Sequence, residues 1–311
     1  MSAAPVPEVP ADPAGLARVR FPVLRSVGRA VLSSRKAMAG ASLLAVFVVM
    51  AIVPGLIAPG VPGTELYRPG QGASFAHLLG TTSYGQDIFT QFIWGARASL
   101  IIAVVAGLLS TALSALIGVS AGYLAGVADG ILSLITDVFL VIPAFPLVVV
   151  IAAYSKSGGN VTIIAVLVAT GWAYGARQLR AQVLSLRNRD FLVAARLRGE
   201  RVFRIIVSEL LPNMTSLLVA NFLGASVYAI LTAAGLQFIG LGNVNTDSWG
   251  TMLYWAQNNE ALQAGLPLWA IAPGLGIALL GGAFALLNYA FDEISNPALR
   301  RARGRDGRSD P

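Results

Sequence analysis

The chain has 311 residues, of which 56% are hydrophobic and only 12% are charged, whereas about a quarter of the residues in a soluble globular domain are charged. This composition excludes an ordinary soluble enzyme. The chain has no cysteine and a single histidine, His77, which excludes disulfide frameworks, thiol nucleophiles and zinc clusters. Neither Lys36 nor Lys156 follows a glycine, so an ATP-binding Walker loop is excluded as well.

Six apolar stretches are long enough to cross a membrane. An α-helix rises 1.5 Å per residue, so about 20 apolar residues span a bilayer core about 30 Å thick. The stretches that meet this length are 37–58, 98–128, 130–154 and 157–176, one within 210–246 and one within 261–291. The sequence therefore predicts an all-α integral membrane protein with six transmembrane helices, the first of them an uncleaved anchor rather than a signal peptide.

These spans divide the chain into segments. We expect a cytoplasmic N-terminal tail over 1–36, transmembrane helix 1 over 37–58, an external segment over 59–97, a five-helix core over 98–291 and a cytoplasmic C-terminal tail over 292–311. The core includes one long hydrophilic loop, over 177–212, between the fourth and fifth spans. It is the most conspicuous exception to the short connections of the predicted bundle.

Arginine and lysine are unevenly distributed between the two sides that six spans define. Nineteen of them precede the first span, lie between the fourth and fifth spans, or follow the sixth, while Arg68, Arg97 and Lys156 lie on the other side. Basic residues near span ends stay in the cytoplasm, so both termini are predicted to be cytoplasmic. The formal net charge of +7 thus reflects topology rather than nucleic-acid binding.

Glycine and proline mark special positions within the spans. Gly118, Gly122 and Gly126 recur every four residues and predict a helix face that packs closely against another helix. Pro143 and Pro146 predict a kink in the third span. Candidate pore-lining residues lie in spans three and five, namely Pro143, Pro146, Asn221 and Thr232.

Few ionisable side chains lie within the predicted spans. Asp137 is a carboxylate inside the third span, and such groups commonly serve a proton or ion site. Its position near the cytoplasmic start of the span favours the other interpretation, a pair with the basic loop. His77 and Asp87 lie in the external segment, where we expect them to order the chain rather than to perform chemistry.

The loop from Arg177 to Pro212 has the pattern of a helical hairpin. Asp190 is placed to cap a first helix, which Gly199 ends at a left-handed position. A second helix follows, and Pro212 marks its end. Its predicted apolar face consists of Val202, Phe203, Ile206, Val207 and Leu210, with Arg201, Arg204 and Ser208 directed elsewhere.

Two interpretations of this hairpin remain open from its composition. Cationic amphipathic helices bind anionic lipid surfaces, so the hairpin can lie on the membrane. Alternatively, it docks into a groove of a cytoplasmic partner, with apolar side chains supplying affinity and arginines supplying register.

Several spaced motifs resemble one family. Ala194-Ala195, Gly199 and Leu211-Pro212 resemble the permease signature of bacterial ABC importers, with Val193 in place of its glutamate and Glu209 at a position that often holds isoleucine or histidine. Further segments are similar to the C-type permease subunit of dipeptide and oligopeptide importers: Leu79-Gly80-Thr81-Thr82, Gly85-Gln86-Asp87-Ile88, Gly95-Ala96-Arg97, and the stretches 236–242, 248–253, 273–275 and 292–300. The resemblance covers about residues 30–300.

The resemblance implies a type I ABC importer permease in a bacterial inner or plasma membrane. Its implied partners are a second, different permease subunit, two cytoplasmic ATPases that bind ATP and Mg, and an external peptide-binding protein. This chain would then have no catalytic residue, cofactor or metal of its own. The residues implied in coupling to the ATPases are Ala194, Ala195, Gly199, Arg201, Arg204, Leu211 and Pro212.

Other functions stay open at this point. Permeases for nickel or another small solute share these motifs. An ion-coupled secondary transporter also fits the six-span count, although such carriers need charges within the membrane and often show inverted repeats. A purely structural membrane scaffold is a third possibility, against which the hairpin motif argues.

Overall fold

The computed structural model describes residues 35–63, 66–154 and 159–295, and it is almost entirely helical over these ranges. An isolated bridge between Thr81 and Asp87 is the only β pairing in them. The helices are α2 (Arg35–Ile52), α3 (Pro54–Ile57), α4 (Ile88–Leu124), α5 (Gly126–Val141), α6 (Ala144–Tyr154), α7 (Asn160–Gly171), α8 (Ala173–Leu186), α9 (Asp190–Leu197), α10 (Val202–Ile205), the π-helical turn η2 (Ile206–Leu210), α11 (Leu211–Asn213), α12 (Thr215–Phe238), α13 (Trp249–Asn258) and α14 (Pro267–Ser295). Most of the two predicted tails lies outside the described residues.

The helices that are long and apolar enough to cross a membrane are α2, α4, α12 and α14. The bent pair of α5 and α6 makes a fifth candidate, and α7 is a shorter apolar helix that continues into α8. Six spans are compatible with this set if α7 and α8 together form one of them. The structure is thus an all-α membrane fold.

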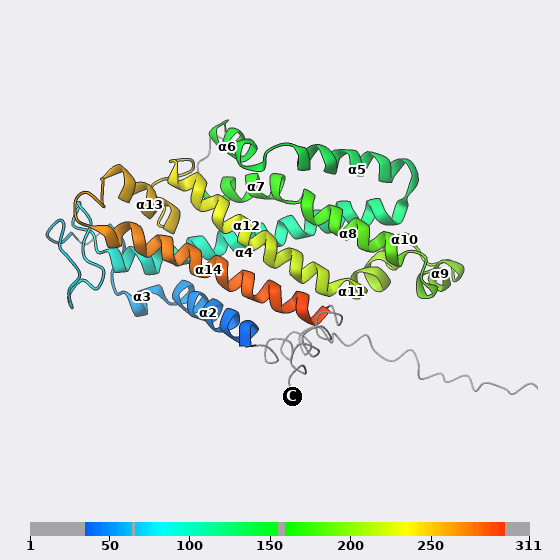
Figure 1. Ribbon diagram of the computed structural model, residues 1–311, viewed down its shortest axis with the longest axis horizontal. Coiled ribbons are helices and arrows are strands. Elements are labelled where there is room, and N and C mark those ends of the chain that lie inside the picture. The colour runs from blue at the N-terminus through cyan, green and yellow to red at the C-terminus, as the bar shows by residue number, and fades with distance from the viewer. Residues whose placement is uncertain (1–34, 64–65, 155–158, 296–311) are drawn as a thin grey trace, which may run out of the picture.

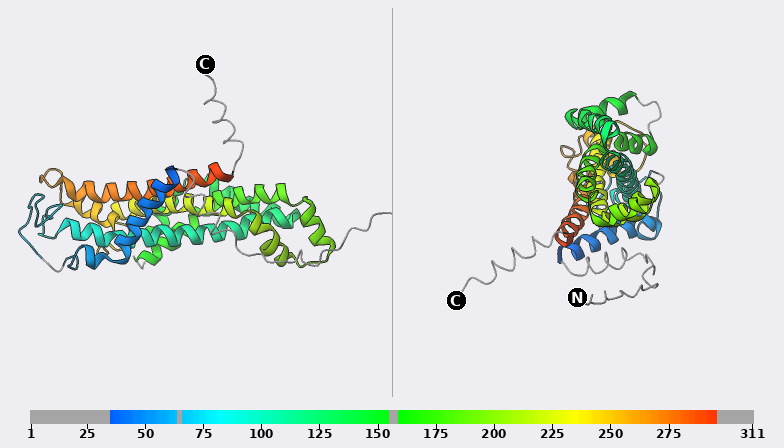
Figure 2. Two further views of the ribbon diagram at one scale, coloured as in Figure 1. Left: turned by 90° about the horizontal axis from the view of Figure 1, so that it is seen from below. Right: turned by 90° about the vertical axis from the view of Figure 1, so that its right-hand side faces the viewer.

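The helices form an elongated bundle with distinct ends (Figure 1). Helix α4 runs along most of its length and packs against α12 and α8, while α14 packs against α12 and α2. Helix α2 crosses the other helices obliquely, as Figure 2 shows from below. One end of the bundle carries α13 and the segment before α4, and the other end carries α9 and α10.

Helix α4 begins earlier than the sequence predicted. The second span was expected to start at residue 98, but Asp87 caps the helix by accepting a hydrogen bond from the Thr90 amide, at 2.8 Å, so the helix starts at Ile88. The other carboxylate oxygen of Asp87 lies 3.0 Å from His77 Nδ1. This pair supports the expectation that His77 and Asp87 order the segment before α4.

Two of the predicted spans are broken. Helices α5 and α6 meet at an angle of 90°, which confirms the kink predicted from Pro143 and Pro146. Pro143 lies in the break itself, where a proline ring prevents a helix from continuing. A second interruption separates α7 from α8 at Trp172, which is almost fully buried.

The main hydrophobic core lies toward the end of the bundle that carries α13 (Figure 1). The fully buried Trp249 of α13 packs between Phe47 and Phe92 with ring centroids 5.3 and 5.5 Å away, and its indole nitrogen donates to the Phe92 carbonyl. This packing joins α13 to α2 and α4. This end of the bundle is therefore held together by contacts that do not involve the hairpin at the opposite end.

Candidate functional site

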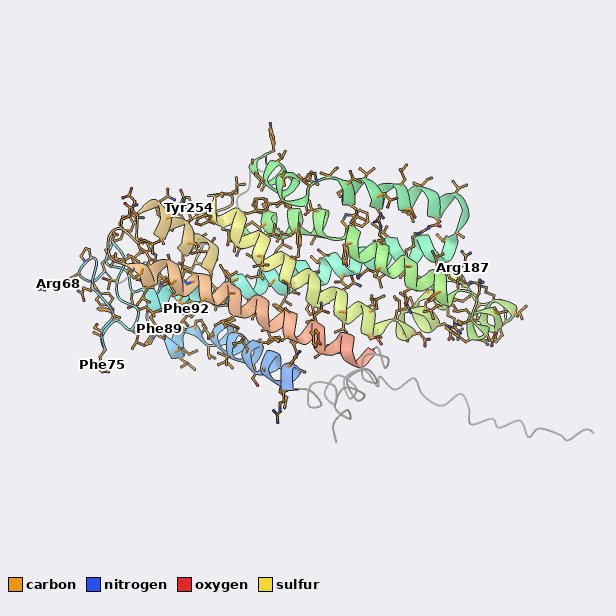
Figure 3. The ribbon with its side chains drawn as sticks, viewed as in Figure 1. Arg68, Phe75, Phe89, Phe92, Arg187 and Tyr254 are labelled. Atoms are coloured by element: carbon orange, nitrogen blue, oxygen red, sulfur yellow. The ribbon has the colours of Figure 1, made fainter. Side chains whose placement is uncertain are left out.

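The hairpin of α9, α10 and η2 lies at the end of the bundle opposite α13 and the segment before α4 (Figure 1). Figure 3 shows the separation: Arg68 and Phe75 lie at one end of the long axis, and Arg187, at the C-terminal end of α8, lies near the other. Helix α8 leads into the hairpin, and α11 and α12 lead out of it. The hairpin thus lies between α8 and α12, and α12 is long and apolar enough to cross a membrane.

Gly199 makes the turn between the two helices of the hairpin. Its φ angle is +72°, in the left-handed region that favours glycine. The Gly199 amide donates to the Arg196 carbonyl at 2.9 Å, and the Glu200 amide donates to the Ala195 carbonyl at 3.2 Å. These two bonds form a Schellman motif. The predicted role of Gly199 as the helix-ending residue is confirmed.

The second half of the hairpin differs from its predicted amphipathic face. Ile205 and Leu210 are the buried side chains, whereas Val202, Phe203 and Val207 are exposed. The cause is the π-helical turn η2, in which the hydrogen bonds join residues five apart rather than four. Residues 205 and 210 therefore share the buried face, which the regular helical period does not predict.

The start of the hairpin also differs from the prediction. The residue at the N-cap of α9 is Arg189, which makes no side-chain capping bond, and Asp190 is the first residue of the helix. The Asp190 carboxylate in the first turn still interacts favourably with the helix dipole. Pro212 lies one residue before the end of α11 at Asn213, so it marks the end of the second half of the hairpin as predicted.

The inner side of the hairpin is fixed to the bundle by a hydrophobic cluster. Leu192 and Ala195 of α9, together with Ile205 and Leu210, are at most 2% exposed. They pack against buried residues of α4, α8 and the start of α12, namely Val119, Leu179, Val183 and Met214. Because both halves of the hairpin pack on the same cluster, they are held at a fixed angle to each other.

The outer side of the hairpin exposes apolar side chains together with arginines. Leu197 is 84% exposed and Phe203 is 78% exposed, and further exposed apolar residues adjoin them, namely Val193, Val202 and Val207. Arg198 pairs with Glu200 at 2.9 Å, and Arg204 approaches the same carboxylate at 3.8 Å. We call the five exposed apolar residues Val193, Leu197, Val202, Phe203 and Val207 the outer apolar face.

The residues that the resemblance implied in coupling fall on both sides of the hairpin. Ala195 belongs to the buried cluster, and Ala194 and Leu211 are partly buried. The remaining four, Gly199, Arg201, Arg204 and Pro212, are exposed. The motif thus combines residues that hold the hairpin in place with residues that are available to a partner.

Two ion pairs connect α8 to α5. Arg180 binds Asp129 through two hydrogen bonds, of 2.6 and 2.8 Å, and Arg177 binds Asp137. The second pair confirms the interpretation of Asp137 as a partner of the basic loop. Sequence reasoning missed the first pair, although Asp129 and Arg180 flank the same predicted spans, because a spacing of 51 residues gives no local signal.

The three spaced glycines of the second span have different environments. A Cβ atom built on Gly118 would overlap the backbone of Ala176, and one on Gly122 would lie 2.8 Å from the Val183 Cβ atom. Both contacts are with α8. Gly126 differs from the expectation of close packing, since it lies beyond the end of α4 with φ +62°, and a Cβ there would meet nothing within 4 Å.

Comparison with known proteins places this arrangement in a family. Residues 114–301 match the model of the "binding-protein-dependent transport system inner membrane component" family. This match covers more than half of the chain and includes the whole hairpin. The chain belongs to this family of transport-system membrane components. Family membership leaves the ion-coupled secondary transporter and the structural scaffold without support.

Named relatives agree with the family match. The chain is 36% identical over 280 residues to the dipeptide transport system permease protein DppC of Escherichia coli K12, covering 86% of this chain and 91% of the relative. It is 33% identical over 278 residues to DppC of Bacillus subtilis, covering 88% and 85%. It is 34% identical over 230 residues to the oligopeptide transport system permease protein OppC of Mycobacterium tuberculosis H37Rv, covering 73% and 79%.

Proposed function

We propose that this chain is the C-type permease subunit of an ATP-driven ABC importer and forms half of the path for dipeptides or oligopeptides. The relatives named as dipeptide and oligopeptide permeases support the substrate class. The importer has a second permease subunit, two cytoplasmic ATPases that bind ATP and Mg, and an external peptide-binding protein. The chain resides in a bacterial inner or plasma membrane with both termini in the cytoplasm, as the distribution of basic residues supports.

The outer apolar face of the hairpin is the observation that carries the docking part of this proposal. Leu197 and Phe203 are large apolar side chains that are mostly exposed on a hairpin whose other side is buried in the bundle. Exposed apolar patches on a rigid element mark interaction sites, and a helix laid into a groove uses such a face. The ATPases dock here, and the arginines beside the face set the register.

The test replaces this face in the complete transporter. We expect the double variant Leu197→Ser and Phe203→Ser to lose the ATPases during affinity purification and to lose ATP-driven peptide uptake in proteoliposomes. The matched control is Val127→Ser, because Val127 is 81% exposed and lies outside the hairpin. Retention of both the ATPases and uptake by the double variant would reject docking at this face, and weaker binding to anionic vesicles alone would support the lipid-surface interpretation.

A further inference from the structure

The bundle contains a cavity of about 620 Å³ whose lining comes from seven helices and from the break between α5 and α6. Its walls are formed by α4, α8, α12 and α14, and the C-terminal end of α5 with Pro143 borders it. The interruption between α7 and α8 also borders it through Gly171 and Ala173. Its volume is in the range of sites that hold small organic ligands.

Three amide side chains from three different helices line this cavity: Gln178 of α8, Asn221 of α12 and Asn288 of α14. The Asn288 Oδ1 atom is buried and has no hydrogen-bond partner in the part of the chain that the structure describes. Asn221 donates to the Leu217 carbonyl at 3.1 Å, and within the same residues its Oδ1 atom accepts nothing. The Gln178 side chain makes no hydrogen bond to any described residue.

The hydroxyl groups of the cavity differ from the amides. Thr111 and Ser114 donate to carbonyls one turn earlier in α4, and Thr170 does the same in α7, with bonds of 2.8 to 2.9 Å. Their hydrogens are therefore used within the fold. Unpaired polar groups away from water cost free energy, roughly 1–3 kcal/mol each. The Asn288 Oδ1 atom carries this cost, because it is buried and has no partner among the described residues.

Glycines bring the amides close to the opposite walls. A Cβ atom on Gly175 of α8 would lie 2.7 Å from the Asn221 Oδ1 atom, and one on Gly224 of α12 would lie 3.8 Å from the Asn288 Nδ2 atom. Asn221 and Gly224 are one turn apart on α12, and Gly175 and Gln178 are one turn apart on α8. The amide groups are thus distributed along adjoining walls of one space.

The lining has no formal charge. None of the described residues that line the cavity is acidic, basic or a histidine. A divalent cation is ordinarily held by carboxylates, and the described lining contains none. A peptide backbone fits it, since each peptide unit offers one N–H donor and one carbonyl acceptor, and each amide side chain offers both as well.

We propose that this cavity is a binding site for the substrate backbone in transit, in which Gln178, Asn221 and Asn288 hold peptide units by neutral hydrogen bonds. The inference rests on the proposed function and specifies how its path treats the substrate. Because the site binds the peptide backbone and carries no charge, it does not discriminate among peptides by the charge of their side chains. A single carboxylate introduced into its wall should disfavour peptides with acidic side chains relative to peptides with basic ones.

The experiment gives the site a charge. The complete transporter is reconstituted in proteoliposomes, and the binding protein is loaded to equal occupancy with Ala-Ala-Ala, Ala-Lys-Ala or Ala-Glu-Ala. The wild type imports the three peptides at similar rates. In Asn221→Asp, the ratio of Ala-Glu-Ala to Ala-Lys-Ala import falls about tenfold, because like charges repel strongly where water is scarce. The control Asn160→Asp adds the same charge outside the cavity lining and leaves the ratio unchanged.

A second measurement does not depend on that variant assembling. Because the chain has no cysteine, Gln178→Cys provides a single thiol in the cavity. A small water-soluble thiol reagent labels it in the intact complex, and peptide-loaded binding protein with ATP slows the labelling. An unreactive thiol would mean that a neighbouring subunit fills the cavity and would overturn the proposal, as would an unchanged import ratio in Asn221→Asp. Failure of the wild type to import any peptide would instead reject the proposed function.

Discussion

The contact between α4 and α8 at Gly118 supports a quantitative prediction. A Cβ atom on Gly118 would lie 2.9 Å from both the Cα and carbonyl C atoms of Ala176 and would overlap its carbonyl oxygen. These are backbone atoms of α8, so no side-chain rotation relieves the overlap. Even the smallest substitution, Gly118→Ala, forces the two helices apart.

The expected magnitude follows from two opposing effects. Alanine in place of glycine stabilises a helix by roughly 0.5–1 kcal/mol, whereas overpacking a close contact costs about 1–3 kcal/mol. The backbone overlap places Gly118→Ala toward the upper end of that cost, so we expect a net loss of about 2 kcal/mol. The matched control is Gly130→Ala on α5, where a Cβ atom would meet nothing within 4 Å. This variant should gain the stability that alanine adds to a helix without the cost of overpacking.

The assay is thermal unfolding of the purified chain in detergent, followed by tryptophan fluorescence. Gly118→Ala should unfold at a clearly lower temperature than the wild type, and Gly130→Ala at the same or a higher temperature. Equal unfolding temperatures for the two variants would refute the close approach of α4 and α8 as the reason for glycine at position 118.

Three further predictions concern the hairpin, the ion pairs and the topology. Gly199→Val should release the ATPases on co-purification, because a branched side chain opposes the φ angle of +72° at a cost of about 1–2 kcal/mol, whereas Gly199→Asn should retain more of them. Asp129→Asn should lower the unfolding temperature more than Asp137→Asn, since the first pair is bidentate and partly buried and the second is more than half exposed, where a pair contributes less than about 1 kcal/mol. Cysteines introduced at residues 70 and 306 should label from opposite sides of the membrane, and labelling from one side would contradict cytoplasmic termini.

The break between α5 and α6 and the turn of the hairpin were the most predictable features of the fold, whereas the start of α4 and the interruption at Trp172 were not anticipated. Pro143 and Pro146 predicted the bend between α5 and α6, and Gly199 predicted the turn of the hairpin. In each case a single residue type restricts the backbone, so its effect does not depend on distant packing. The pair between Asp137 and Arg177 was also predictable, because a carboxylate in an apolar span requires a partner.

Features that depend on tertiary packing were not predictable in the same way. The π-helical turn at 206–210 separates the side chains of the predicted apolar face, so that Leu210 is buried while Val202, Phe203 and Val207 are exposed. Nothing in the local sequence pattern distinguishes a helix with hydrogen bonds five residues apart from one with bonds four apart. The cavity was anticipated only in part. Of the four candidate pore-lining residues, Asn221 and Pro143 line it, whereas Pro146 and Thr232 do not. Gln178 and Asn288 were missed, and the available signal was an amide side chain within a run of apolar residues.

Helix α8 is a single uninterrupted helix that connects the cavity to the hairpin. Its first turns border the cavity through Tyr174 and Gln178, and its last turns, with Val183, pack against the hairpin. From Gln178 to its last residue, Leu186, this helix is about 12 Å long, so a tilt of about 10° about the hairpin end moves Gln178 by roughly 2 Å. A displacement of this size along a hydrogen bond lengthens it well beyond the distance at which it forms. A modest rotation of the hairpin is therefore sufficient to move the Gln178 amide out of hydrogen-bonding reach of a group in the cavity.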